Sequence, residues 1–196
     1  MDNKKIMKVA NICDTIAKVL GCFLCIGIFA EIFSIFILLI FGEQMYESGY
    51  TFSELFFKKL YPADGYQLNL DLVKTYIVTI TFIDAVLLFA DYYIIKQLRQ
   101  ILRPMKEGRS FEENVPVNLR KIAWTILASG GISCIASIVE RIILTKIFSP
   151  SVTDEIEYSS YFTMDFDVIF TFFIIMLLSH IFFYGKNLQK ESDETL

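Results

Sequence analysis

The sequence has 196 residues, of which 55% are hydrophobic, and its mean hydropathy is +0.51. Soluble domains reach about 45–50% apolar residues only when glycine is counted, and glycine is left out of this figure, so the composition excludes an ordinary soluble domain. The formal net charge of −4 says little by itself, because in a membrane protein the distribution of charge along the chain matters more than its sum.

Four apolar runs are long enough to cross a bilayer, which takes roughly 20 residues in a helix. The runs cover residues 17–41, 76–95, 122–148 and 168–184, and most charged residues lie between them or at their ends. We therefore predict an all-α, polytopic membrane protein with four transmembrane helices in one domain spanning residues 1–196.

The first run contains Cys22 and Cys25, which are spaced by one helical turn like a redox pair. No cationic residue stands beside them to activate a thiol, and lipid on all sides favours small packing residues. The chain's four cysteines are scattered, so they indicate no disulfide framework.

The stretch between the second and third runs, residues 96–121, is basic and holds seven Lys and Arg residues. A short basic loop between two spans stays on the cytoplasmic side. With this connector inside, thirteen Lys and Arg residues fall on its side and four on the other. We therefore predict that both termini are cytoplasmic.

Cysteine labelling tests this topology. In a cysteine-free background, an impermeant thiol reagent added to intact cells should label Ser151→Cys, which lies between the third and fourth apolar runs. It should leave Ser110→Cys, in the connector, unlabelled. Labelling of Ser110→Cys in intact cells would contradict the topology.

Prolines set the helix boundaries within the connector. The second helix should run to about Leu102, before Pro104 stops it. A capping box at Ser110 contributes about 1 kcal/mol, but it would place Pro116 in the helix interior at a cost of about 3 kcal/mol. We therefore expect the third helix to begin near Val115 with Asn114 as its N-cap. Within that helix, glycines at positions 130 and 131 would allow a close helix neighbour or a kink.

Acidic side chains at depth are candidate functional groups, because a charge inside lipid costs roughly 2.5–3.5 kcal/mol. At about 1.5 Å per residue, Glu31 and Asp84 reach mid-membrane and would meet if the first two helices pack as a hairpin. We expect both to face the protein interior. Two interpretations stay open: the acids share a proton or a cation, or a hydrogen-bonded acid stabilises the helix packing.

Other ionisable residues lie nearer the surfaces. Two are close to the cytoplasmic side, Asp91 and His180. Four lie at the outer rim, where Arg141 can pair with an aspartate: Glu140, Arg141, Asp165 and Asp167. We interpret the rim group as structural.

Soluble-enzyme motifs are absent from the sequence. The single histidine and the scattered cysteines make no zinc site, and there is no nucleotide-binding glycine loop. We predict no catalytic, cofactor or metal residues. The basic connector beside a membrane indicates orientation and contact with anionic lipid rather than nucleic-acid binding.

Two cytoplasmic pieces resemble a known family. They are the connector, with Gly-Arg-Ser-Phe-Glu-Glu-Asn at 108–114 and Leu-Arg-Lys-Ile-Ala at 119–123, and the closing sequence from Tyr184 to Leu196. Both look like those of domain of unknown function 2975, a family of small four-span membrane proteins. The resemblance implies a bacterial cytoplasmic membrane protein, often encoded beside a small helix-turn-helix regulator, with no enzymatic activity and no established ligand.

Our leading hypothesis is a non-enzymatic membrane regulator that binds a cytosolic, DNA-binding helix-turn-helix protein. The candidate partner-binding residues lie in the connector and tail: Arg99, Arg103, Arg109, Phe111, Asn114, Arg120, Lys121, Leu188, Gln189, Glu191 and Asp193. We expect the acidic tail to fold back against the connector, or else to be a solvated end. The alternative is a small transporter, channel or self-protection protein that uses Glu31 and Asp84.

Overall fold

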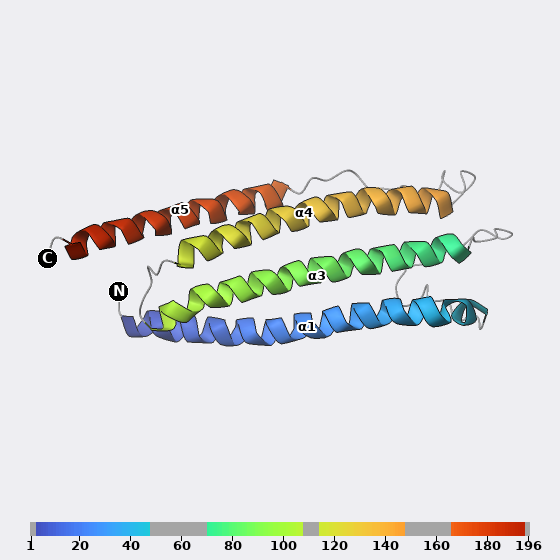
Figure 1. The fold of residues 1–196 in the computed structure, drawn as a ribbon, viewed down its shortest axis with the longest axis horizontal. Helices are drawn as coiled ribbons and strands as arrows, with labels where there is room; N and C mark the ends of the chain where they lie inside the picture. Colours follow the sequence, from blue (N-terminus) through green and yellow to red (C-terminus); the bar gives the residue numbers. More distant parts are fainter. Residues whose placement is uncertain (1–2, 48–69, 108–113, 148–165, 195–196) are drawn as a thin grey trace. The chain divides into compact units, whose positions relative to one another are not determined.

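The computed structural model describes residues 3–47, 70–107, 114–147 and 166–194. This part of the chain forms four helices, α1 (Asn3–Glu47), α3 (Leu70–Lys106), α4 (Asn114–Ile147) and α5 (Phe166–Glu194), and contains no strand (Figure 1). All four helices are long and apolar enough to cross a membrane. The predicted all-α class with four candidate spans is therefore confirmed.

The helix boundaries within the connector differ from expectation at one end. α4 begins at Asn114 and holds Pro116 in its first turn, as predicted. α3 does not stop at Leu102 but continues through Pro104 to Lys106, so that prediction was wrong. A proline removes one N–H donor and crowds the carbonyl four residues earlier. Pro104 lies in the last turn of α3, and there this energetic cost did not end the helix. The Pro104 carbonyl still accepts a bond from the Glu107 N–H at 3.0 Å.

The chain divides into two compact units. The first combines Met1–Ile28, Leu87–Ile132 and Met164–Leu196, and the second combines Phe29–Val86 and Ser133–Thr163. Helices α1, α3 and α4 each contribute to both units. The prediction of one domain stays a prediction.

In the first unit, α1 packs antiparallel to α3 through small residues. A Cβ built on Gly21 would lie 3.7 Å from Ile95, and one on Gly27 would lie 3.5 Å from Leu88. Later residues of α1 thus meet earlier residues of α3, as in a helical hairpin. Small side chains let two helix backbones approach closely. The two glycines therefore allow this part of α1 to lie directly against α3.

The apolar core of the first unit joins α3, α4 and α5. Its buried members are Ile101 of α3 with Val115 and Ile122 of α4. Side chains from all three helices pack around them: Ile94, Met105, Leu119, Ile126, Ile175 and Phe182. The first turns of α4 and the last turns of α3 therefore pack together, although residues 107–113 separate the two helices in sequence.

Close packing joins α4 and α5 in the same unit. A Cβ on Gly130 would lie 2.5 Å from the Cγ1 atom of Val168, whereas one on Gly131 would meet no atom within 4 Å. Six residues earlier in α4, Trp124 meets Phe172 edge to face with ring centroids 5.3 Å apart. The close neighbour expected at the glycine pair is confirmed for Gly130.

A hydrogen bond fastens α5 to the start of α4. Ser179 is fully buried, and its hydroxyl donates to the Pro116 carbonyl at 2.8 Å. The bond connects residues that are far apart in sequence, and it fixes the register of α5 against the first turn of α4.

Ser179→Ala should lower the free energy of unfolding by about 1 kcal/mol, because a buried carbonyl loses its partner from the neighbouring helix. Denaturant titration followed by fluorescence of Trp124, the chain's single tryptophan, measures the change. Ser137→Ala is the matched control, since that hydroxyl donates only within its own helix, to Ser133 at 3.0 Å. We expect the control to change the free energy of unfolding by less than about 0.5 kcal/mol. Equal losses in the two variants would mean that the Ser179 hydrogen bond does not stabilise the contact between α4 and α5.

Candidate functional site

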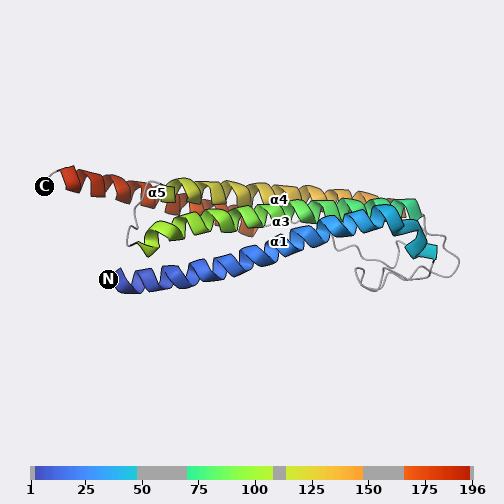
Figure 2. The same ribbon diagram turned by 60° about the horizontal axis from the view of Figure 1, so that its bottom comes forward.

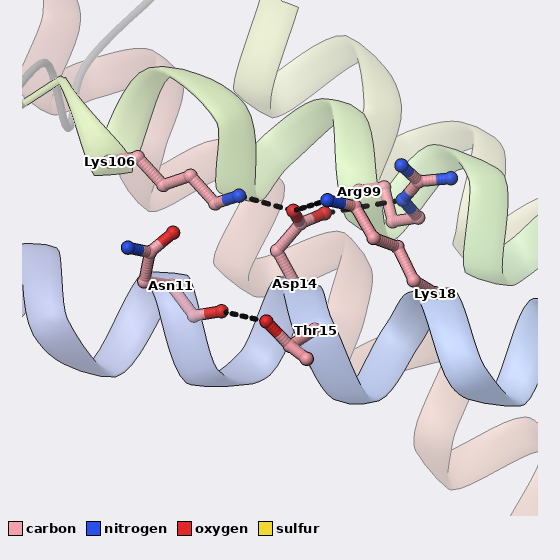
Figure 3. Close-up of polar contacts among 6 residues, drawn as sticks. All are labelled: Asn11, Asp14, Thr15, Lys18, Arg99 and Lys106. Atoms are coloured by element: carbon pink, nitrogen blue, oxygen red, sulfur yellow. Dashed lines mark hydrogen bonds and ion pairs between the residues drawn. The ribbon is translucent and has the colours of Figure 1, made fainter.

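A buried carboxylate surrounded by cations is the principal polar site of the first unit. Asp14 of α1 has only 8% of its side chain exposed. Its Oδ1 accepts a hydrogen bond from Arg99 Nε at 3.2 Å, while its Oδ2 lies 3.3 Å from Lys18 Nζ and also contacts Lys106 Nζ (Figure 3). We call these four residues the Asp14 cluster.

The two helices position the cluster by their periodicity. Lys18 lies four residues after Asp14, so both side chains emerge from the same face of α1. Arg99 and Lys106 are seven residues apart, which brings them to the same face of α3 after two turns. Lys106 reaches Asp14 only because α3 continues past Pro104. The unexpected helix extension therefore completes the site.

The electrostatics of the Asp14 cluster are unbalanced. Three cations face one carboxylate, and their side chains remain 55% (Lys18), 45% (Arg99) and 25% (Lys106) exposed. The desolvated anion is therefore fully compensated, and the cluster keeps a net positive charge. Such an arrangement ties α1 to the end of α3 and leaves cationic donors open to an external anion.

Asp14 was not among the predicted site residues, because it precedes the apolar run at 17–41 and was not counted as an acid at depth. A signal was nevertheless present, since Asp14 is the only acid between residues 3 and 30. It also shares a stripe of small buried residues with Ala10, Ala17 and Gly21. A lone carboxylate on the close-packing face of a basic segment predicts a cationic partner on the neighbouring helix.

Of the predicted partner-binding residues in the connector, the structure brings Arg99 into the Asp14 cluster. Arg103 is exposed near the end of α3, and Asn114, Arg120 and Lys121 are exposed in the first turns of α4. Two further candidates lie outside the described residues, Arg109 and Phe111.

The tail is helical, because α5 continues to Glu194. The expected contact of its acids with the connector stays a prediction. Good helix formers fill this stretch, and Lys190 pairs with Glu194 at 3.7 Å one turn later. The end of α5 extends beyond the start of α4 (Figures 1 and 2). Of the candidates here, Leu188, Gln189 and Glu191 are exposed, and Asp193 lies in the same helix.

The acids predicted at mid-membrane lie in the second unit. The Glu31 and Asp84 carboxylates are close enough for their charges to interact, and so are those of Asp84 and Glu140. The Tyr76 hydroxyl donates to Glu140 Oε1 at 2.7 Å. Glu31 is half-buried, but Asp84 is exposed, so the expectation that both acids face the interior was wrong for Asp84. Depth along a helix does not fix the direction of a side chain around its axis.

Four of the remaining predicted residues lie in the described helices. Asp91, Arg141, Asp167 and His180 are all exposed, and Asp165 lies outside the described residues. Within the part of the chain that the structure describes, no group of three His, Cys, Asp or Glu residues is arranged to hold a metal ion.

Comparisons with known proteins identify a family. Searches of curated proteins and of solved structures find no match to the chain. A family model described as "Protein of unknown function (DUF2975)" matches residues 15–196, which is nearly the whole chain and includes three candidate spans entirely and most of the first. The chain therefore belongs to the DUF2975 family, as the connector and tail sequences indicated.

Proposed function

We propose that this chain is a non-enzymatic protein of the bacterial cytoplasmic membrane, with both termini inside, that binds a cytosolic helix-turn-helix regulator. The partner class comes from the family resemblance of the connector and tail. The single observation that best supports a protein-binding role is the continuation of α5 as a helix to Glu194. A helix that leaves its apolar run presents a preformed surface to a partner.

The exposed end of α5 suits recognition by a groove. After Tyr184 it carries mostly polar and charged residues, with Leu188 as an apolar side chain that is 49% exposed. An apolar anchor on a polar helix is a common recognition element, because partners bind amphipathic helices in hydrophobic grooves. Burying one leucine contributes about 1.5–3 kcal/mol, enough to change affinity by tenfold or more.

A flotation experiment tests this proposal. The purified chain is reconstituted into neutral liposomes, mixed with a purified helix-turn-helix regulator of the kind that the family resemblance implies, and centrifuged through a density gradient. The regulator should float with liposomes that contain the chain and remain below with empty ones. Leu188→Asp should weaken binding by about tenfold or more, because the anchor becomes a charge.

Asn187→Asp is the matched control. It adds the same charge one residue earlier, at an exposed position about 100° around the helix. It should reduce binding far less than Leu188→Asp. Equal effects would reject α5 as the binding surface, and a regulator that never floats with the chain would reject the partner.

An ion or proton pathway is the second candidate function. It is favoured by the interacting acids of the second unit, Glu31, Asp84 and Glu140. Acids within spans often mark ion and proton routes because their desolvation is costly.

Flux into proteoliposomes tests this second candidate. Glu31→Gln and Asp84→Asn should each abolish proton or cation flux that the unmodified chain supports. Asp91→Asn is the control, because it removes another exposed acid two turns further along α3. Flux that is absent from the unmodified chain, or insensitive to both substitutions, would reject the pathway.

A further inference from the structure

The Asp14 cluster holds more donors than its carboxylate uses. Arg99 contacts Asp14 through Nε, and Figure 3 shows its two terminal nitrogens directed away from the carboxylate. Lys18 uses one contact to Asp14 while 55% of its side chain is exposed. Together they offer a planar guanidinium fork and an ammonium group, which are the groups that bind phosphate oxygens in proteins.

The cluster lies where the apolar runs meet polar sequence. Asp14 precedes the run at 17–41 by three residues, and Arg99 follows the run at 76–95 by four. Apolar side chains on the same turns are exposed, including Ile16 at 53% and Val19 at 52% on α1. An anion bound here would have phosphate donors beside it and an apolar helix surface extending away from it.

We propose that Lys18, Arg99 and Lys106 bind the phosphate of an anionic phospholipid headgroup, whose acyl chain lies along the exposed apolar residues of α1. Basic pockets between transmembrane helices on the cytoplasmic side are a recurring site for anionic headgroups. A free phosphate would contact only the cations, whereas a phospholipid would contact both the cations and the exposed apolar residues of α1. Asp14 offsets one of the three positive charges and competes with the phosphate for their donors.

This site is separate from the protein-binding surface proposed above, since it uses α1 and α3 rather than α5. The lipid experiment contains no partner protein, so it can fail or succeed independently of flotation.

Native mass spectrometry of the full chain, released from detergent with one equivalent of phosphatidylglycerol or phosphatidylcholine, measures the first bound lipid. The unmodified chain should retain phosphatidylglycerol preferentially. Arg99→Gln should weaken that binding about fivefold, because each cation beside an anionic headgroup contributes about that factor. Arg99→Lys keeps the charge but loses the fork, and it should weaken binding by a smaller factor.

Asp14→Asn distinguishes a lipid site from a purely structural cluster. Removing the competing carboxylate should tighten phosphatidylglycerol binding about fivefold, even though it makes the protein less stable. The measurement is made on the folded fraction recovered by size exclusion. Weaker lipid binding in this folded variant would overturn the proposal.

Lys8→Gln is the matched control. It removes an exposed cation of α1 six residues before Asp14, about 9 Å along the helix, where screening is substantial. Its effect on the first bound lipid should be less than about twofold. Equal losses of lipid affinity in Lys8→Gln and Arg99→Gln would mean that the lipid responds to the overall positive charge and not to a specific site. Displacement of the lipid by inorganic phosphate at equal concentration would reject a lipid as the ligand.

Discussion

Gly130→Val is expected to lower the free energy of unfolding by about 1–3 kcal/mol, the range for overpacking a closely packed helix contact. A Cβ at this position would lie 2.5 Å from Val168 Cγ1 and 3.2 Å from Val168 Cγ2, so the Val168 side chain or the α4–α5 spacing would have to shift. Denaturant titration should show the loss. Fluorescence of Trp124 in the folded state should also change, because its contact with Phe172 reports the α4–α5 spacing.

The adjacent glycine supplies the control for this prediction. Gly131→Val makes the same change in helix propensity at a position where a Cβ meets no atom within 4 Å. It should be neutral or slightly stabilising, since glycine is a poor helix former. Adding Val168→Ala to Gly130→Val should restore part of the lost stability, and a double-mutant cycle without coupling would contradict the contact.

Asp14→Asn is expected to lower the free energy of unfolding by about 2 kcal/mol. Exposed ion pairs contribute about 0–1 kcal/mol, whereas removing one partner of a buried pair costs about 3–5 kcal/mol. Asp14 is buried but its cations are partly exposed, which places the cluster between these limits. The loss should appear as a lower midpoint in denaturant, with the helical circular dichroism of the native state retained.

Lys18→Gln is the comparison for the Asp14 prediction. Lys18 and Asp14 belong to the same helix as an i, i+4 pair, and such pairs contribute about 0.3–0.5 kcal/mol. Its loss should therefore be several times smaller than that of Asp14→Asn. Similar losses would mean that the contacts of Asp14 with α3 contribute nothing beyond the local pair.

The family resemblance and the fold class could both be predicted from the sequence because they depend on local features. About 20 apolar residues specify a span wherever it packs, and the start of α4 at Asn114 follows from the tolerance of the first helical turn for Pro116. The family match over residues 15–196 likewise agrees with what the connector and tail sequences indicated.

The site required the tertiary structure. Pro104 signals a helix end by local rules, yet α3 continues to Lys106, whose ammonium group contacts Asp14 of another helix. Gly130 and Gly131 are equivalent in sequence, and only the packing of α5 makes the first a close contact. Asp84 was expected to face the interior but is exposed. In each case the sequence specified the position along a helix, while contacts between helices decided the partner and the direction of the side chain.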